Sequence, residues 1–294
     1  MSKENSEKLV SIVLPIYNGE KYMRLSIDSI LSQTYKNWEL IIIDDCSTDK
    51  TPEIAKAYSD KDARISYYRN EVNLKLPRGL NRGFSLSKGD YLTWTSDDNL
   101  YLPEAIERML NTLQKENTDF VFATCDVINE NGEVVEIIKA PKNYKKAILG
   151  GNFVGACFMY TRKVYEAIGD YNPDNFLVED YDYWLKIFAK FDVSNIQDVL
   201  YQYRWHDGAL TSTEKKERIN DVCERVLINN VREYGKLGFL QKYYFYSQLD
   251  RLRQCKSDKK EREKYRKKYK ILRVGYMMFY YIPKRLIDMI FGQR

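Results

Sequence analysis

Two pairs of adjacent carboxylates stand out, because each follows a short apolar run. They are Asp44 with Asp45 and Asp97 with Asp98. Neighbouring acids at the end of a buried strand repel each other and lose hydration, which costs free energy unless a cation or a donor compensates. A hard divalent cation, Mg²⁺ or Mn²⁺, that bridges ligand phosphates would compensate at Asp97 and Asp98. The alternative is that each pair opens the next helix, as a cap or an Asx turn.

A third acid pair and one histidine add candidates for chemistry. His206 is the only histidine in the chain, and it lies in the run Arg-Trp-His-Asp. A lone histidine is more often structural, but this polar run favours a neutral imidazole that binds the same metal. Glu179 and Asp180 lie where a loop enters a helix. One interpretation is that their negative charges interact favourably with the dipole at the amino end of the helix. The other is that one of them acts as a general base toward an attacking hydroxyl.

The elements that must position these residues alternate between strands and helices. Buried strands are predicted at residues 10–16, 39–43, 65–68 and 91–94, with helices at 20–32, from 51 and at 78–87. This alternation predicts a parallel sheet that is covered on both faces. Ligands of such sheets bind beyond the carboxyl ends of the strands. Both strand-end acid pairs are therefore expected along one edge of the sheet.

The rest of the chain is less regular and ends in helices. Strands are predicted at 120–126, 134–138 and 201–206, a strand with a loop of small residues at 150–160, and a helix at 176–190. From about residue 214 onward the pattern is helical only. We therefore expect an α/β domain over residues 1–213 and a C-terminal helical region over residues 214–294.

Composition narrows the function classes. The chain has 294 residues, of which 44% are hydrophobic and 30% charged, so it can bury a sizeable core. The five cysteines are scattered without metal-ligand spacing, which predicts reduced thiols, no zinc site and a cytoplasmic location. The polar start predicts no signal peptide, and no apolar run is long enough to span a bilayer.

The C-terminal region combines a basic segment with an aromatic one. Residues 256–270 are strongly basic, and residues 271–291 are apolar and aromatic but interrupted by Pro283. No nucleic-acid reading module accompanies the charge, so nucleic acid is not expected as a partner. Three alternatives stay open: an interfacial membrane anchor, a helical pair packed on the catalytic domain, and a homodimer interface.

Taken together, the segments resemble the family 2 glycosyltransferases of the GT-A fold, over roughly residues 9–210. The resemblance is carried by VSIVLPIYNGEKY, SILSQTYKNWELIIIDDCSTDKT, NLKLPRGLNRGFSLSKGDYLTWTSDDNLYLP, VEDYDYWLKI and YRWH. It implies a Rossmann-like, mostly parallel sheet flanked by helices. It also implies an inverting enzyme that moves a sugar from a nucleotide diphosphate donor, with UDP favoured, to a hydroxyl of a saccharide.

The resemblance also implies a role for each candidate residue. It places the base and ribose beside Pro15, Tyr17 and Glu20, the nucleoside beside Asp44 and Asp45, and the nucleotide or its phosphates beside Asn73, Lys75 and Arg78. It places the ribose or sugar beside Asp97 and the metal at Asp98 and His206. It makes Asp180 the general base and places the acceptor region at Glu179 and Trp184. Many relatives have an acid where this chain has Thr95, so here the metal depends on Asp97 and Asp98.

The implied activity is a metal-assisted single displacement with Mn²⁺ or Mg²⁺, in bacterial surface polysaccharide or glycolipid assembly. The acceptor would be a saccharide or lipid-linked saccharide, and the location cytoplasmic or peripheral on the inner face of the membrane. Two alternatives remain. A sugar-phosphate nucleotidyltransferase usually opens with a Gly-rich, basic phosphate loop, which LPIYNGEKY lacks. A non-catalytic nucleotide-sugar-binding scaffold would lose the base or the metal acids, which are present.

Overall fold

The computed structural model describes residues 8–210, 215–254, 256 and 258–281. The chain divides into two compact units. The first comprises residues 1–140 and 153–213, and the second comprises residues 141–152 and 214–294. Residues 141–152, which were predicted to belong to the first domain, therefore group with the C-terminal helices.

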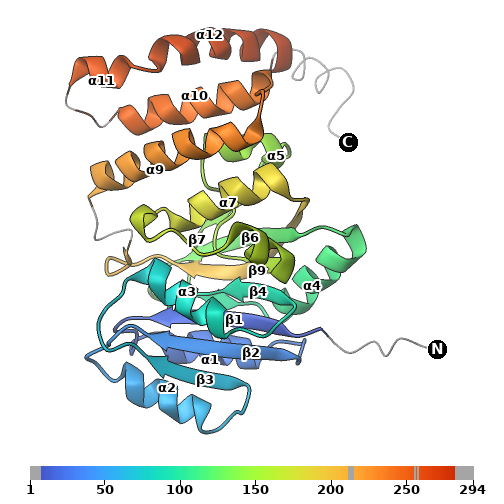
Figure 1. Ribbon diagram of the computed structural model, residues 1–294, viewed down its shortest axis with the longest axis vertical. Helices are drawn as coiled ribbons and strands as arrows, with labels where there is room; N and C mark the ends of the chain where they lie inside the picture. The colour runs from blue at the N-terminus through green and yellow to red at the C-terminus, as the bar shows by residue number, and fades with distance from the viewer. Residues whose placement is uncertain (1–7, 211–214, 255, 257, 282–294) are drawn as a thin grey trace. The chain divides into compact units, whose positions relative to one another are not determined.

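A mixed sheet forms the centre of the first unit (Figure 1). Its strands are β1 (Val10–Ile16), β2 (Trp38–Asp44), β3 (Ile65–Arg69), β4 (Tyr91–Trp94), β5 (Leu100–Tyr101), β6 (Phe120–Ile128), β7 (Val134–Ile138), β8 (Phe158–Thr161) and β9 (Val193–Arg204). Their order is β3-β2-β1-β4-β8-β6-β9-β5, and β7 pairs with β6. The predicted α/β class is confirmed. The first four strands are parallel, whereas β5, β7 and β8 pair antiparallel with their neighbours.

The parallel register brings the predicted acid pairs to one edge. Ile16 at the end of β1 lies opposite Asp44 at the end of β2. Beyond the strands, the amide of Asp45 donates to the carbonyl of Ile16 at 2.8 Å, and that of Thr95 donates to the carbonyl of Val13 at 3.0 Å. The segments that follow β1, β2 and β4 therefore leave the sheet side by side.

Helices cover both faces of the sheet. They are α1 (Met23–Leu31), α2 (Thr51–Ser59), α3 (Leu76–Leu86), α4 (Ala105–Glu116), α6 (Arg162–Ile168) and α7 (Glu179–Lys190). Alternate side chains of β1 point to opposite layers, as the pleat requires. Ile12 joins a core cluster with Met23 of α1, whereas Val13 faces α3. A Cβ on Gly83 would lie only 2.3 Å from Cγ1 of Val13, so glycine lets α3 pack close to the strand.

Two helices begin later than the sequence pattern predicts. The helix expected from residue 20 begins at Met23, because the preceding turn bonds to the loop after β2. The helix expected from residue 176 begins at Glu179. It cannot extend further back, because Leu177 has φ +82°, outside the right-handed helical region. A 3₁₀ turn, η2 (Pro173–Asn175), precedes it.

The described residues of the second unit form helices joined by short loops. Its elements are α5 (Tyr144–Ala147), η1 (Ile148–Gly150), α9 (Lys216–Asn230), η3 (Val231–Tyr234), α10 (Phe239–Arg253), α11 (Lys259–Glu263), α12 (Arg266–Tyr276) and the π-helical turn η4 (Met277–Tyr281). Leu227 and Leu249 are fully buried, and the rings of Tyr243 and Tyr276 stack at 4.3 Å. No helix in the described part of the chain has the length and apolarity needed to cross a membrane. The predicted aromatic segment at 271–291 lies outside the described residues from 282 onward.

Candidate active site

One carboxylate and the only histidine meet at the carboxyl edge of the sheet. Asp98 lies between β4 and β5, and His206 follows β9. Nε2 of His206 lies 3.1 Å from Oδ2 of Asp98, and the two side chains are 15% and 19% exposed, respectively. Oδ1 of Asp98 is buried and has no hydrogen-bond partner among the residues that the structure describes. The fold thus brings both predicted metal ligands together and leaves one carboxylate oxygen available.

Asp97 packs against the turn that follows β1. A Cβ on Gly19 would lie 2.1 Å from Oδ2 of Asp97, so this contact requires glycine. Burial, and then the charge of Asp98, raise the pKa of Asp97 to about 7. Burial also raises the pKa of Asp98, although His206 acts in the opposite direction. These shifts mean that two ionised carboxylates are costly here without a cation, as the sequence pattern suggested.

The three side chains suit a divalent cation. The buried, unpartnered Oδ1 of Asp98 is a ready ligand atom, and carboxylate with imidazole is a donor set that Mn²⁺ accepts. Among the described residues no group of three or more His, Cys, Asp or Glu side chains forms a metal-binding cluster. The protein would therefore contribute few ligands and leave coordination positions to phosphates and water, as at many nucleotide sites. Asp98 and His206 would hold the ion, with Asp97 beside them.

The carboxylate of Asp44 is used in hydrogen bonds within the protein. It is fully buried, and Oδ2 accepts a hydrogen bond from the hydroxyl of Tyr67 at 2.8 Å. Oδ1 accepts from the amide of Ser47 at 2.8 Å, which closes an Asx-type turn after β2. The guanidinium of Arg69 lies 3.8 Å from the same carboxylate. Asp44 therefore shapes the loop that follows the strand.

Asp45 holds a different loop. Oδ1 accepts from the side chain of Asn70 and from the amide of Leu74, each at 2.7 Å, and Oδ2 accepts from the amide of Lys75 at 2.8 Å. A carboxylate offers about four lone-pair positions. Three are occupied by this loop, which leaves capacity for one more donor at the edge of the sheet.

The turn after β1 is tied to the loop after β2. The amide of Lys50 donates to Oε2 of Glu20 at 2.9 Å, and the amide of Thr48 donates to Oδ1 of Asn18 at 2.8 Å. Asn18 has φ +56°, a conformation that asparagine tolerates better than most residues. The ring of Tyr17 remains 53% exposed beside this turn. Glu20 thus acts within the loop, while Tyr17 is available to a ligand.

Basic residues gather at the start of α3. Lys75 and Arg78 are exposed there, and Pro15 of β1 lies half-buried below Gly79 of the same helix. Oδ1 of Asn73 accepts from the amide of Lys75 at 3.1 Å. A helix N-terminus with two cations is a favourable place for phosphate.

The third acid pair begins α7. Glu179 is 4% exposed, and its Oε2 has no hydrogen-bond partner among the described residues. Burial, and then the charge of Asp180, raise the pKa of Glu179 to about 8. Asp180 is partly exposed, and its Oδ1 accepts from the amide of Tyr181 at 2.6 Å. Glu179 is therefore neutral near pH 7, beside a more accessible carboxylate.

Trp184 lies in the core. It is fully buried, and its ring centroid lies 4.4 Å from that of Phe158 and 5.1 Å from that of Phe120. Its side chain is therefore not accessible to an acceptor. Its helical spacing with other apolar residues, which the sequence shows, is the signal that favoured packing.

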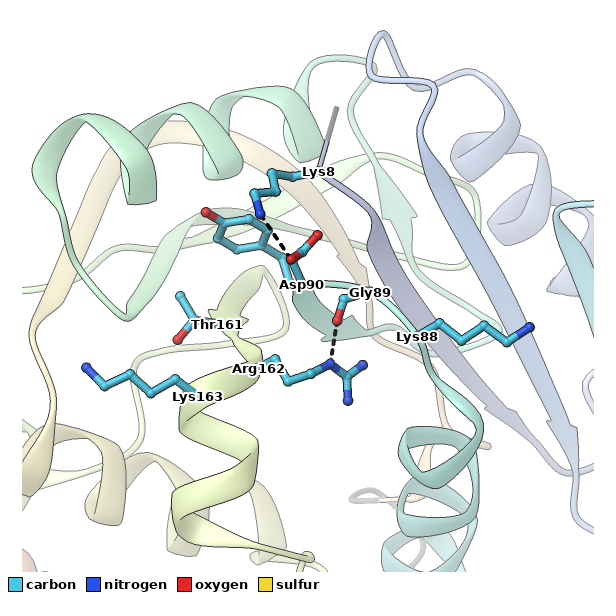
Figure 2. A pocket seen from close by; sticks show the side chains of 8 residues that line it. Lys8, Lys88, Gly89, Asp90, Thr161, Arg162 and Lys163 are labelled. Atoms are coloured by element: carbon cyan, nitrogen blue, oxygen red, sulfur yellow. Dashed lines mark hydrogen bonds and ion pairs between the residues drawn. The ribbon is translucent and has the colours of Figure 1, made fainter. Parts of the chain in front are cut away.

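A shallow pocket at the opposite edge of the sheet is lined by four cations and one acid (Figure 2). Lys8 pairs with Asp90 at 3.2 Å, and Arg162 donates to the carbonyl of Gly89 at 2.6 Å. Lys163 turns to Asp119 at 3.1 Å. The three lysines of this pocket are exposed to water, so their charges do not require a ligand, whereas one oxygen of Asp98 is buried without a partner among the described residues.

The model of Glycosyl transferase family 2 matches residues 11–169, more than half of the chain. The chain belongs to this family. An uncharacterized glycosyltransferase of Rickettsia typhi is 34% identical over 254 residues, which cover 82% of the chain and 74% of that relative. The chain is therefore a glycosyltransferase, as the sequence predicted.

Two solved structures resemble this family 2 chain in fold. S. aureus TarS in complex with UDP-GlcNAc matches 82% of the chain and 72% of its own length, with a TM-score of 0.66 and 17% identity. The mannosyltransferase PcManGT from Pyrobaculum calidifontis, in complex with GDP-Man and Mn²⁺, matches 97% of the chain and 80% of its own, with a TM-score of 0.64 and 14% identity. These likenesses confirm the GT-A fold.

Two further residues of the candidate site in this family 2 chain were not predicted from the sequence. Arg204 is 3% exposed and donates from Nε to the carbonyl of Asp98 at 3.1 Å. Tyr22 lies with its ring centroid 5.4 Å from that of His206. Both residues stand inside the quoted motifs YRWH and YNGEKY, but the motifs do not indicate what their side chains contact. No local rule of sequence links the two residues, which are far apart in the chain.

Proposed function

We propose that the chain transfers a sugar from a nucleotide diphosphate donor, with UDP favoured, to a hydroxyl of a saccharide, with inversion at the anomeric carbon. The observation that carries this proposal is the Asp98–His206 pair with its buried, unpartnered carboxylate oxygen at the carboxyl edge of the sheet. Proteins of the same fold are solved with UDP-GlcNAc and with GDP-Man and Mn²⁺, which supports a nucleotide-sugar donor. A nucleotidyltransferase has no such support.

The donor end of the site would be built from the loops after β1 and β2. Tyr17 offers an exposed aromatic face to the base. Asp45 has one lone-pair position left for a donor group of the nucleoside, while Asp44 and Glu20 keep the two loops in place. Lys75 and Arg78 at the start of α3 would attract the phosphates.

The diphosphate end would be built around Asp98 and His206. They would hold Mn²⁺ or Mg²⁺, which when bound offsets the charge of the leaving diphosphate. Asp97, pressed against Gly19, would border the ribose or sugar. The ion would thus already be in place when negative charge develops on the leaving diphosphate. An interaction that is stronger in the transition state lowers the barrier, whereas one made equally with the bound substrate does not.

The acceptor end would depend on Asp180. It is the accessible member of the acid pair at the start of α7, and the neutral Glu179 beside it adds no second negative charge near pH 7. Asp180 would take the proton of the acceptor hydroxyl as that oxygen attacks the anomeric carbon from the face opposite the diphosphate. A single displacement needs no covalent sugar intermediate, so one carboxylate suffices.

We also propose that the acceptor is a lipid-linked saccharide in bacterial surface polysaccharide or glycolipid assembly, and that α12 contacts an anionic membrane surface. Ile271, Val274 and Phe279 are 65%, 54% and 74% exposed, whereas Tyr276 packs on α10. Residues 264–281 carry six lysines or arginines and no acid. Exposed apolar side chains among cations favour anionic headgroups over plain water.

Cosedimentation with vesicles tests the membrane contact. The protein should pellet with phosphatidylglycerol-containing vesicles but not with pure phosphatidylcholine. The Ile271→Ser/Val274→Ser variant should stay in the supernatant, while Lys145→Glu/Lys146→Glu, which changes exposed cations on α5, should still pellet. If the first variant pellets normally, or instead turns a dimer into a monomer in light scattering, the membrane contact is refuted.

Two measurements test the reaction. Calorimetric titration with UDP, GDP and dTDP, with and without Mn²⁺, should show metal-dependent binding of one nucleotide. Incubation with the matching nucleotide-sugars should release the diphosphate, and NMR of the transferred sugar should show the anomeric configuration inverted. A product with retained configuration would contradict the single displacement, and failure to bind any nucleotide would contradict the donor site itself.

A further inference from the structure

We propose that Tyr22 and Arg204 form a clamp that positions Asp98 and His206 to bind the divalent cation. The inference rests on the proposed metal-assisted donor site. It assigns Tyr22 and Arg204 as positioning residues, which act through the two ligands without touching the ion. Metal ligands must be held close to the required geometry by the groups behind them, so such residues change metal affinity when they are replaced.

The guanidinium of Arg204 connects three segments that are distant in sequence. Its Nε donates to the carbonyl of Asp98 at 3.1 Å. Its Nη1 donates to the carbonyls of Asn129 and Glu130 in the β6–β7 hairpin, at 3.0 and 3.2 Å. Its own amide donates to Oδ1 of Asn99 at 2.8 Å. The buried side chain of Arg204 thus holds the carbonyl of Asp98 and the β6–β7 hairpin, and its amide ties the end of β9 to the side chain of Asn99.

The ring of Tyr22 lies beside both Arg204 and the proposed metal ligand His206. The guanidinium carbon of Arg204 lies 4.7 Å from the Tyr22 ring centroid, and the imidazole of His206 lies 5.4 Å from it, tilted by 55°. Tyr22 immediately precedes α1, which is part of the core. The ring therefore rests on a fixed element and limits the positions that the imidazole can take.

A surface ion pair closes the arrangement. Nζ of Lys21 lies 2.9 Å from Oε2 of Glu130 and 4.7 Å from the Tyr22 ring centroid. It joins the start of α1 to the same hairpin that Arg204 holds. Because both of these charged groups are more than half exposed, we assign the positioning to the ring and the buried guanidinium.

Arg162 provides a matched control. Its guanidinium also donates to backbone carbonyls, from Nε to Gly89 and from Nη2 to Ser87 at 3.1 Å, but it does so at the opposite edge of the sheet (Figure 2). In either place, an Arg→Lys change replaces the planar guanidinium and its several N–H donors by a single ammonium group. A loss of stability is expected from both variants, whereas a loss of metal affinity is expected only from Arg204→Lys.

The single histidine allows a direct measurement. In the full-length protein every imidazole NMR signal comes from His206, so broadening of its Hε1 signal by MnCl₂, with and without UDP, reports metal binding close to this residue. We expect Arg204→Lys and Tyr22→Leu to raise the apparent Kd for Mn²⁺ by about tenfold or more, the range typical of groups that support metal ligands. Tyr22→Phe keeps the ring and should stay within about twofold of the unmodified protein.

The outcomes separate the two levels of inference. If Mn²⁺ leaves the His206 signal of the unmodified protein sharp at all concentrations, both the metal site and the clamp are refuted. If that signal broadens and Arg204→Lys and Tyr22→Leu respond like the unmodified protein, the clamp alone is refuted. The same holds if Arg162→Lys weakens Mn²⁺ binding as strongly as Arg204→Lys, because general destabilisation would then explain the effect.

Discussion

Charged side chains gather at both edges of the parallel sheet, where the strands begin (the amino edge) and where they end (the carboxyl edge). The two groups differ in burial and in hydrogen bonding. At the amino edge, Lys8 pairs with Asp90 and Lys163 with Asp119. At the carboxyl edge, Asp97 and Asp98 stand side by side, and one buried oxygen of Asp98 has no partner among the described residues. The lysines at the amino edge are exposed to water, so folding alone explains them. Buried carboxylates without a partner cost stability and point to a ligand.

The same contrast holds for the carboxylates within the carboxyl edge. Asp44 and Asp45 accept several hydrogen bonds each and hold the loops. Asp98 and Glu179 each keep a buried oxygen without a partner in the described part of the chain. Position at a strand end therefore does not identify a ligand residue by itself. The number of hydrogen bonds that a carboxylate already accepts is the sharper criterion.

The largest effect is expected from Asp180→Asn. An amide of the same shape cannot accept the acceptor proton, so kcat should fall by about 10³-fold, within the range for a general base. Binding of UDP in the presence of Mn²⁺ should stay unchanged in calorimetry, because Asp180 does not belong to the donor end. A variant that keeps more than a tenth of the activity would show that another group is the base.

A smaller effect is expected from Asp98→Asn, compared with Asp90→Asn at the amino edge. Removing the charge of Asp98 should weaken Mn²⁺-dependent UDP binding by about 10² to 10³-fold, since a metal ligand is lost. Asp90 is half-exposed and paired with Lys8, so its variant should bind as the unmodified protein does. Equal losses in both variants would mean that net charge, and not a defined metal site, governs binding.

The sequence predicted the parallel half of the fold well. The strands Val10–Ile16 and Tyr91–Trp94 were predicted with their observed limits from runs of mostly apolar residues, because burial between two helical layers demands continuous apolar strands. Local patterns could not predict that β8 inserts antiparallel between β4 and β6, or that β5 pairs with β9 about a hundred residues later. Those pairings depend on contacts between distant segments.

The same limit applies to the candidate site. Asp98 and His206 were predicted from residue type and motif, and their contact at 3.1 Å needed only that both follow strands of one sheet. The role of Arg204 could not be predicted, because its three acceptor carbonyls belong to backbone, which has no sequence signature. The family resemblance placed Trp184 in the acceptor region, although its position in the helix points it into the core.

A change in pH dependence is expected from Glu179→Gln. Burial raises the pKa of Glu179 from its ordinary value of 4.5 to about 8 in the folded protein. Between these values the unfolded chain has lost the proton and the folded chain keeps it, so this group makes the folded state less stable as pH rises. The glutamine variant cannot ionise and should show a smaller loss of stability between pH 5 and about 8 in urea unfolding. If both proteins change in parallel across this range, Glu179 is not neutral in the folded state.

The smallest effects are expected at the amino edge. Lys8→Ala and Lys163→Ala each remove one exposed partner of an ion pair, with lysine side chains 49% and 70% exposed. Such pairs contribute about 0 to 1 kcal/mol because water and salt screen them. Urea unfolding at low and high salt should therefore show small changes that shrink further as salt is added, with transfer activity unaltered. A loss of UDP binding in either variant would mean that the pocket of Figure 2 takes part in donor binding, and the two edges would no longer differ in kind.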